Sequence, residues 1–313
     1  MAETPVSGVP DPGGQGGQGG TIAPGRVALL GTGYIGGSIL LGLRRAGLVT
    51  RCAGFDADPA MLKAALDRGI IDEAADSPAG AAREADVVVL ATPVGATATL
   101  AAAVAPVLRP GCLVFDIGSI KASVVAAVEE ALRGTGAHFV GTHPIAGQEF
   151  RGPTASDGTL FTGRLCILTP TPHTEPAALG RCARLWLALG ARIAQLDPVL
   201  HDRVLGAISH LPHVASFALA ATVDRVLRQD DEQARVAHGL WGGGFADTTR
   251  IAASNPIMWR DILLANRDVL LPLVETMIDE LEGLRTAMSG GEGEALVETI
   301  QRAARGRRQV MGG

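Results

Sequence analysis

The segment GTGYIGG, residues 31–37, follows a short apolar run at residues 26–30. Its glycines fit the pattern G-x-G-x-x-G through Gly31, Gly33 and Gly36. In such a turn the first glycine allows a sharp change of direction and the second lets the backbone approach a pyrophosphate. The third lets the following helix lie close to the strand. Because the chain has 41 glycines, the pattern alone is weak and its surroundings decide what it means.

The residues after the turn complete a dinucleotide-binding unit. Residues 34–45 have a helical pattern that ends before Gly47, and the apolar run 49–55 leads directly into Asp56. An acidic residue at that point accepts hydrogen bonds from the adenosine ribose and repels a phosphate there, so the sequence favours NAD over NADP. The alternative is a glycine-rich turn in another kind of α/β protein, and the order of strand, turn, helix, strand and acid disfavours it.

Length and composition exclude several classes of protein. The 313 residues can form two domains, and a formal net charge of −5 offers no basic face for nucleic acid. No uninterrupted apolar run approaches the ~18 residues of a membrane span. The N-terminus lacks the basic and apolar segments of a secretory signal. We therefore expect a cytoplasmic protein with neither a nucleic-acid nor a membrane partner.

The four cysteines lie far apart and lack C-x-x-C spacing: Cys52, Cys112, Cys166 and Cys182. This arrangement is typical of small core residues in a reducing compartment, rather than of a disulfide framework or a metal site.

Three regions follow from the pattern along the chain. Residues 1–24 are rich in Gly, Pro and Gln and cannot bury enough apolar surface to become ordered, so we expect a disordered tail. Residues 25–197 alternate apolar strands with helices. This predicts an α/β domain of the Rossmann type, with a doubly wound, mainly parallel sheet covered by helices on both faces. Residues 198–313 have helical patterns only, which predicts an all-α second domain.

The individual elements are expected where apolar runs end in Gly, Pro or polar residues. Strands are predicted at 26–30, 49–55, 70–72, 86–91, 112–117, 138–142, 165–168 and 193–196. Helices of the second domain are predicted at 201–226, 232–241, 256–285 and 293–305. Several of these helices carry Leu, Ala and Val over much of their circumference, so we expect them to bury surface against a partner subunit in a homodimer.

The ligand of an open parallel sheet binds beyond the carboxyl ends of its strands. The predicted cofactor contacts therefore follow the strands: Gly31, Thr32, Gly33, Tyr34, Ile35, Gly36, Asp56, Thr92, Pro93 and Gly118. Two polar side chains, Ser119 and His143, follow later strands on the nicotinamide side. A neutral histidine can take the proton of a hydroxyl group while hydride leaves, and Ser119 could orient His143 or bond the same hydroxyl.

Both side chains also have a purely structural interpretation. A histidine before a proline can simply cap a turn. Ser119 follows a glycine and precedes a helix, a position where serine is a common N-cap. The residues alone leave these alternatives open.

The motifs GTGYIGGS, ATP, DIGSIK and GTHPIAGQE, in this order on the strand ends, resemble the prephenate/arogenate dehydrogenase family. The resemblance continues through HDRVLGAISHLPH (201–213) and DTTRIAASNPIMWRDI (247–262), and covers roughly residues 26–290. It implies a Rossmann-type domain, a helical dimerisation domain and an NAD-dependent oxidative decarboxylation of prephenate to 4-hydroxyphenylpyruvate, on the route to tyrosine.

The resemblance also implies roles for single residues. His143 resembles the catalytic histidine that bonds the ring hydroxyl, Ser119 the serine that assists it, and Arg250 the arginine that binds a substrate carboxylate. His210 and His213 match a helix that lines the pocket. Further residues fall near the pocket mouth: Glu149, Asp247 and Trp259. Trp259 is more commonly a core aromatic than a gate, and most arginines lie in solvent or in surface ion pairs.

Prephenate, the substrate that the resemblance implies, carries two carboxylates on a cyclohexadienol ring. Hydride leaves the carbinol carbon, the ring carboxylate departs as carbon dioxide, and the ring becomes aromatic. Aromatisation drives the decarboxylation, so we expect no metal. His210 and His213 lie three residues apart, but Pro212 stands between them and no third ligand is evident.

Four functions share parts of this pattern. Arogenate dehydrogenase and 4-amino-4-deoxyprephenate dehydrogenase carry the same motifs, and the residues that discriminate between the substrates are expected in loops such as 148–153. A non-catalytic dinucleotide-sensing protein would be expected to lose the proton acceptor, whereas His143 is present. Prephenate is the substrate that we predict.

Overall fold

The computed structural model describes residues 23, 25–146, 152–228, 236 and 239–312. The chain forms two compact units, one made of residues 1–205 with 253–265 and the other of residues 206–252 with 266–313. The predicted disordered tail falls almost wholly outside the described residues, and so does most of the helix predicted at 232–241. Glu149 also lies outside them.

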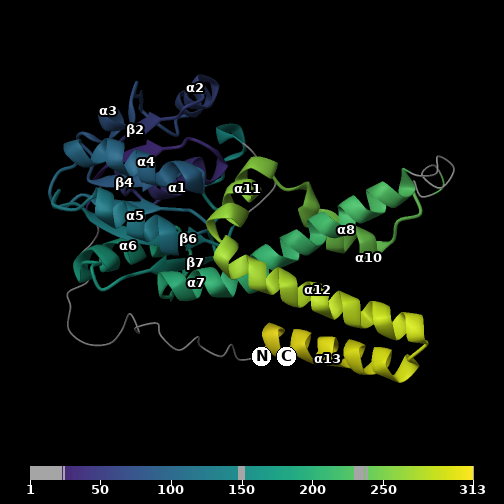
Figure 1. Ribbon diagram of the computed structural model, residues 1–313. Coiled ribbons are helices and arrows are strands. Elements are labelled where there is room, and N and C mark those ends of the chain that lie inside the picture. Colours follow the sequence, from purple (N-terminus) through teal and green to yellow (C-terminus); the bar gives the residue numbers. More distant parts are fainter. Residues whose placement is uncertain (1–22, 24, 147–151, 229–235, 237–238, 313) are drawn as a thin grey trace. The chain divides into compact units, whose positions relative to one another are not determined.

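The first unit is built around one eight-stranded sheet (Figure 1). Its strands are β1 (Gly25–Leu30), β2 (Val49–Phe55), β3 (Glu73–Ala74), β4 (Val87–Leu90), β5 (Leu113–Asp116), β6 (His138–Pro144), β7 (Leu165–Thr169) and β8 (Arg192–Gln195). Their order is β3-β2-β1-β4-β5-β6-β7-β8, and only β6 and β7 are antiparallel neighbours. The predicted doubly wound, mainly parallel sheet is confirmed.

Helices cover both faces of this sheet because its central strands are apolar on both sides. The helices of the first unit are α1 (Tyr34–Arg45), α2 (Pro59–Asp67), α3 (Pro78–Ala82), α4 (Val94–Val104), α5 (Ala122–Ala131), α6 (Pro176–Ala188), α7 (Pro198–Leu205) and α11 (Pro256–Ala265). Helices α1, α2 and α6 share one buried cluster with Val87 and Val89 of β4. Helices α3, α4 and α5 share the other with Val88 and Leu90. Short 3-10 turns occur at Ala105–Val107 and Pro153–Ala155.

The order in which strands are added to the sheet changes sides at β1: β2 and β3 lie on one side of it, and β4 and the later strands lie on the other. Leu30, the last residue of β1, lies opposite Phe55 of β2 on one side and Leu90 of β4 on the other. The carboxyl ends of these three strands therefore meet at one edge, where the glycine turn begins. This is the point at which doubly wound sheets bind their ligands.

The second unit consists of helices and short helical turns in its described residues. They are η3 (Gly206–His210), a π-helical turn; α8 (Leu211–Leu227); α10 (Gly243–Thr249); η4 (Arg250–Ala253), a 3-10 turn whose last residue belongs to the first unit; α12 (Arg267–Gly290); and α13 (Gly293–Met311). No strand follows β8 in the part of the chain that the structure describes. The predicted all-α character of this region is confirmed.

Two predicted elements have different bounds in the structure. The short strand expected at 70–72 lies at Glu73–Ala74, because Ile70 and Ile71 are buried in the core before the strand begins. The single helix expected at 256–285 is two helices, α11 and α12. They are separated at Asn266, whose side chain bonds to His210 instead of continuing a helical surface.

The helix expected at 201–226 is a longer run with a π-helical turn inside it. A Cβ atom at Gly206 would lie 2.8 Å from Cγ1 of Val269, so α12 approaches the backbone closely where the turn widens. By length and composition the run Pro198–Leu227 could cross a membrane, because an 18-residue window within it has a mean hydropathy of 1.4. A long apolar helix in the core or interface of a soluble protein has the same composition. The absence of a membrane partner stays a prediction.

The four cysteines are buried free thiols, which confirms that they are core residues. Burial raises the pKa of the Cys52 thiol to about 12 and that of Cys112 to about 11. Burial also raises the pKa of Cys166 and Cys182. All four are therefore protonated and unreactive at neutral pH.

Candidate active site

The glycine turn has two positions that are closed to side chains and one that is open. Gly31 has φ +94°, and a Cβ there would lie 2.3 Å from the carbonyl oxygen of Ala91. A Cβ at Gly36 would lie 2.5 Å from the carbonyl oxygen of Gly31. A Cβ at Gly33 would have no atom of the described residues within 4 Å, apart from its own chain neighbours. The open side at Gly33 is where a pyrophosphate would approach the backbone.

The N-terminus of α1 is suited to an anion. Its N-cap is Gly33, no side chain caps it, and its first turn has no acidic residue. The first amide groups of a helix lack partners within the helix, and the helix dipole favours negative charge beside them. A phosphate group would satisfy both conditions.

Asp56 is held in place at the end of β2. Its Oδ2 accepts hydrogen bonds from the Thr32 amide at 2.7 Å and the Thr32 hydroxyl at 3.0 Å. Its Oδ1 accepts one from the amide of Asp58 at 3.0 Å. The carboxylate is thus fixed beside the glycine turn, and Asp58 adds a second acidic group two residues later.

Thr92 and Pro93 follow β4 on the other side of the turn. Cγ2 of Thr92 would lie 2.9 Å from a Cβ at Gly31, so the two segments touch. The buried Thr92 hydroxyl has no hydrogen-bond partner among the described residues. A buried hydroxyl without a partner normally has a ligand or water to bond. Together with the open side of Gly33 and the uncapped helix, it fits a dinucleotide.

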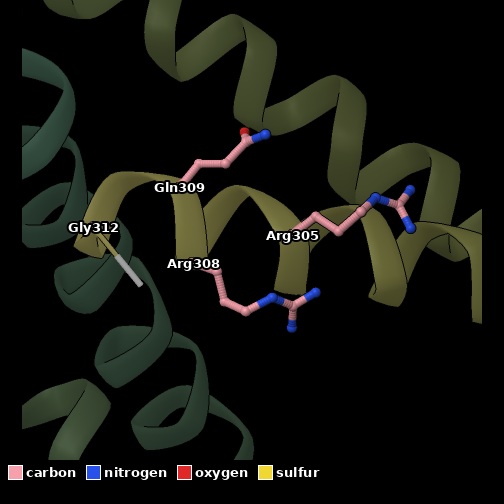
Figure 2. A pocket seen from close by; sticks show the side chains of 4 residues that line it. All are labelled: Arg305, Arg308, Gln309 and Gly312. Carbon is pink, nitrogen blue, oxygen red and sulfur yellow. The ribbon is translucent and has the colours of Figure 1, made fainter.

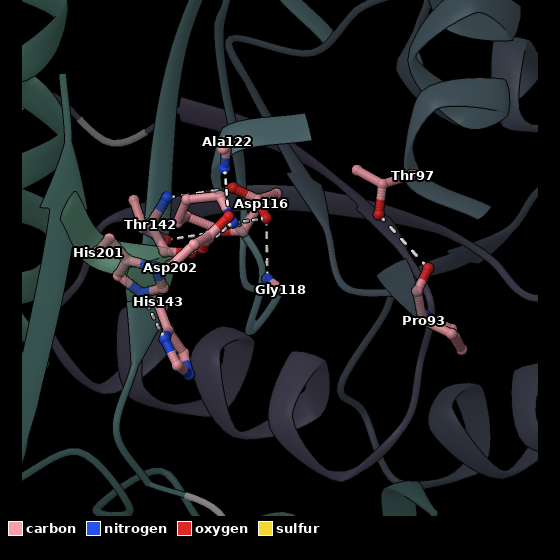
Figure 3. Close-up of polar contacts among 10 residues, drawn as sticks. Pro93, Thr97, Asp116, Gly118, Ala122, Thr142, His143, His201 and Asp202 are labelled. Carbon is pink, nitrogen blue, oxygen red and sulfur yellow. Dashed lines mark hydrogen bonds and ion pairs between the residues drawn. The ribbon is translucent and has the colours of Figure 1, made fainter. Parts of the chain in front are cut away.

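A buried ion pair shapes the loop that carries Ser119. Asp116, at the end of β5, pairs with Lys121, and both side chains are fully buried. Asp116 also accepts hydrogen bonds from the amides of Gly118 and Thr142, at 2.8 and 3.1 Å (Figure 3). Lys121 donates a further bond to the carbonyl oxygen of Thr142 at 2.9 Å. The loop after β5 is thereby tied to β6.

Ser119 does not cap the helix that follows it, so its N-cap interpretation is wrong. The cap residue of α5 is Lys121, and the carboxylate of Asp202 accepts hydrogen bonds from the amides of Lys121 and Ala122, each at 2.8 Å. The half-buried Ser119 side chain makes no hydrogen bond with another described residue. Its hydroxyl therefore remains available for a ligand.

His143 lies within β6, opposite Ile167 of β7, and not after the strand as predicted. Strand pairing extends to Pro144 because β7 runs antiparallel there and the proline needs no amide hydrogen. The side chain is buried, and its Nδ1 lies 2.8 Å from Nε2 of His201. The His143 ring is therefore positioned by another side chain and does not cap a turn.

His201 and Asp202 are the polar residues that the sequence interpretation missed. Both lie on α7, which begins after Asp197, and Nδ1 of His201 lies 2.8 Å from Oδ1 of Asp202. They stand at the start of the stretch HDRVLGAISHLPH. Nothing local in that stretch indicates that its first two residues contact β6 and the N-terminus of α5.

The second unit holds another group of predicted residues. His210 is buried, and its Nδ1 lies 3.0 Å from Nδ2 of Asn266. His213 is half-buried, and its Nδ1 donates to the carbonyl oxygen of Ser209 at 2.8 Å. Burial, together with the positive charge of Arg250, lowers the pKa of His213, so this histidine is neutral at physiological pH. The charge of Arg250 therefore acts on the imidazole of His213.

The remaining predicted residues differ in exposure. Arg250, at the start of η4, is exposed, and so is Asp247 on α10. Trp259 lies on α11 in the first unit and is 6% exposed, as expected of a core aromatic. No group of three or more His, Cys, Asp or Glu side chains with metal-site geometry occurs among the described residues.

A surface recess lies on the last turns of α13 (Figure 2). It is lined by Arg305, Arg308, Gln309 and Gly312. None of the predicted site residues contributes to it.

Comparison with known proteins identifies two family domains in this chain. Residues 39–195 match the prephenate dehydrogenase nucleotide-binding domain, and residues 197–302 match the prephenate dehydrogenase dimerization domain. The cyclohexadienyl dehydrogenase of Zymomonas mobilis is 34% identical over 283 residues, which cover 90% of this chain and 94% of that protein.

Solved structures of the same family are similar to this chain. The crystal structure of prephenate dehydrogenase from A. aeolicus in complex with hydroxyphenyl propionate and NAD+ has a TM-score of 0.82 at 34% identity, and the match covers 93% of this chain and 100% of that one. Synechocystis arogenate dehydrogenase has a TM-score of 0.74 at 27% identity, with 91% and 99% covered. Both family domains are present in order and the likeness extends over nearly the whole chain, so this protein is a dehydrogenase that belongs to the prephenate dehydrogenase family.

Proposed function

We propose that this enzyme oxidises and decarboxylates prephenate to 4-hydroxyphenylpyruvate with NAD, as a step in tyrosine synthesis. The observation that carries the proposal is the place of His143. It is a buried imidazole at the carboxyl end of β6, in the same sheet whose β1 and β2 end in the glycine turn and Asp56. A proton acceptor and a dinucleotide site on one edge of a sheet are the parts that an alcohol dehydrogenation needs.

In this proposal, residues of the first unit bind the ring hydroxyl and accept its proton. NAD, when bound, is the hydride acceptor. His143 takes the hydroxyl proton as the carbinol carbon becomes a carbonyl, and the half-buried Ser119 donates or accepts a hydrogen bond at the same oxygen. Loss of carbon dioxide then makes the ring aromatic, so the protein needs to supply only the proton acceptor, the position of the ring and binding groups for the carboxylates.

Arg250 is proposed to bind a substrate carboxylate, since its guanidinium can form two parallel hydrogen bonds with it. His213 beside it is the better candidate than His210 for substrate contact. His210 is almost fully buried and bonded to Asn266, whereas His213 is only half-buried and its Nδ1 bond to Ser209 leaves Nε2 as an acceptor. Glu149, Asp247 and Trp259 remain proposed contacts near the pocket mouth.

The helical second unit is proposed to join two copies in a cytoplasmic homodimer. Large apolar side chains are exposed along α12 and α13, including Ile278, Leu281, Met288, Val297 and Ile300. An exposed apolar surface on this scale is typical of an interface. The match to a dimerization domain over residues 197–302 supports the same assignment.

Arogenate is the alternative substrate, and the likeness to Synechocystis arogenate dehydrogenase favours it. It carries an amino acid side chain where prephenate has a pyruvyl group. The test is the rate of NADH formation with prephenate and with arogenate, measured side by side on the purified enzyme. We expect kcat/KM for prephenate to be higher by at least about tenfold, the discrimination that one or two altered contacts provide. A higher value for arogenate would replace the proposed substrate.

Cofactor choice provides a second test. The fixed carboxylate of Asp56, with Asp58 nearby, would face the 2′-phosphate of NADP, so we expect kcat/KM with NAD to exceed that with NADP by on the order of a hundredfold. Replacement of Asp56 by Ser should narrow this ratio. Replacement of Asp67 by Ser, an exposed acid at the end of α2, should not. A wild-type preference for NADP would contradict the interpretation of β2 and its acidic end.

A further inference from the structure

Three buried side chains from two distant segments form a continuous hydrogen-bonded chain. His143 on β6 is joined to His201 on α7 through Nδ1 and Nε2 at 2.8 Å, and His201 is joined to Asp202 through Nδ1 and Oδ1 at 2.8 Å (Figure 3). His201 is completely buried, and Asp202 is 3% exposed. Buried polar groups in such a series hold one another in a single arrangement.

The direction of every bond in this chain follows from Asp202. An ionised carboxylate can only accept hydrogen bonds, so Nδ1 of His201 must be the donor. In a neutral imidazole the other nitrogen is then an acceptor, so Nε2 of His201 accepts a hydrogen bond from Nδ1 of His143. His143 is thereby held with its hydrogen on Nδ1, and its Nε2 has the lone pair that a general base requires.

Asp202 is itself fixed by the backbone of α5. Oδ1 accepts the amide hydrogen of Lys121 and Oδ2 that of Ala122, each at 2.8 Å. The bond from His201 adds a further donor to these two amides. The same carboxylate therefore orients His201 and anchors the end of the loop that carries Ser119.

Asp202 supplies the negative charge of this group. Asp116 and Lys121, which tie the loop after β5 to β6, form a fully buried pair and neutralise each other. Cys166 of β7 lies opposite Pro144, the residue after His143, and burial raises the pKa of its thiol, so it is uncharged. A positive charge that appears on His143 is therefore balanced through His201 by Asp202.

We propose that His201 and Asp202 are positioning residues for catalysis, a second function for α7 that rests on the proposed dehydrogenation. They hold His143 in the form with hydrogen on Nδ1 and stabilise the cation that it becomes. The hydroxyl proton of the substrate is transferred to Nε2 of His143, the hydride goes to NAD, and carbon dioxide leaves the ring. Asp202 stays ionised throughout. The electron pair of the broken carbon–carbon bond makes the ring a phenolate, and the phenolate oxygen takes the proton back from His143.

Replacement of Asp202 by Asn tests the charge. Asn can keep the bond to His201 through its oxygen but carries no charge, so the protonated form of His143 becomes less stable. Because a base works in its neutral form, the acidic limb of kcat/KM should move to lower pH by about one unit, while kcat at its optimum falls on the order of a hundredfold.

The matched control is Asp197→Asn, which changes the carboxylate that caps the same helix through the amides of Val199 and Leu200. It should leave the acidic limb where it is. A purely structural role for Asp202 would lower kcat and thermal stability in the Asp202→Asn enzyme without moving its acidic limb relative to the control, and this result would overturn the proposal.

Replacement of His201 tests the tautomer of His143 by a measurement that does not depend on catalysis. Nitrogen-15 NMR of the histidine-labelled enzyme, free of ligands, should show His143 protonated on Nδ1 and not on Nε2. His201→Leu should abolish this preference, and His201→Gln should keep it because the amide oxygen can accept the same hydrogen bond. A wild-type His143 protonated on Nε2, or a Leu variant with unchanged signals, contradicts the proposal. Since this measurement needs no substrate, its failure is distinct from a failure to oxidise prephenate.

Discussion

Replacement of His143 by Asn is expected to lower kcat by about a thousandfold, in the middle of the range that a general base contributes, and to leave the dissociation constant for NAD unchanged. The asparagine amide can still donate a hydrogen bond to Nε2 of His201, so the buried chain keeps its first link. What disappears is the acceptor that takes the substrate proton. The proposed cofactor contacts lie at other strand ends, those of β1, β2, β4 and β5, so we expect NAD binding to be unaffected.

The measurement pairs steady-state kinetics with a direct titration of NAD. His173→Asn is the matched control, since it makes the same change at an exposed turn and should leave both quantities at their wild-type values. A His143→Asn enzyme with near-wild-type turnover would remove His143 from catalysis. An enzyme that loses NAD affinity in parallel with kcat would show that the substitution disturbs the sheet instead.

The cofactor half of the site could be predicted from sequence because its determinants are local. Gly31, Gly36 and Asp56 lie within one strand-turn-helix-strand unit, and their spacing is fixed by the lengths of these elements. The close contacts at Gly31 and Gly36 are backbone contacts, so glycine is the only residue that fits and the pattern is visible without the structure. The doubly wound, mainly parallel sheet could be predicted from the alternation of apolar runs with helices.

The residues that hold His143 could not be predicted in this way. His201 and Asp202 are adjacent in sequence and their partners lie 58 and 80 residues away, on β6 and α5. A single buried carboxylate that caps one helix and orients a histidine on another leaves no periodic pattern. The same limit explains why Ser119 was a candidate N-cap. A serine after glycine and before a helix is a common cap, but the amides at the start of α5 are bonded by Asp202 of α7.

The helix break at Asn266 has a similar origin. The residues on both sides favour helix, and the bond to His210, 56 residues earlier, favours the interruption. That bond also separates two histidines that looked equivalent in sequence. His210 serves the helical packing of the second unit, and His213 is the one with an accessible ring next to Arg250.

Replacement of Arg250 by Ala is expected to raise KM for prephenate by roughly 10- to 100-fold, the equivalent of losing a charge-assisted bond of about 1.5–3 kcal/mol, with a smaller effect on kcat. The carboxylate is bound in the substrate and in the transition state alike, so its loss weakens both. The substitution Arg250→Lys should recover only part of the affinity, because an ammonium group cannot form the two parallel bonds.

Arg260→Ala is the matched control, since this exposed arginine on α11 is already paired with Asp261 at 2.7 Å and should not affect KM. Arg250→Ala has a second, independent consequence at His213. The Arg250 charge contributes to the lowered pKa of that histidine, so its removal should raise the pKa, although burial remains the larger cause and keeps it below the ordinary value. An unchanged KM together with a raised His213 pKa would keep Arg250 beside His213 but exclude it from carboxylate binding. If both KM and the pKa of His213 rise, Arg250 and His213 are parts of one substrate-binding surface.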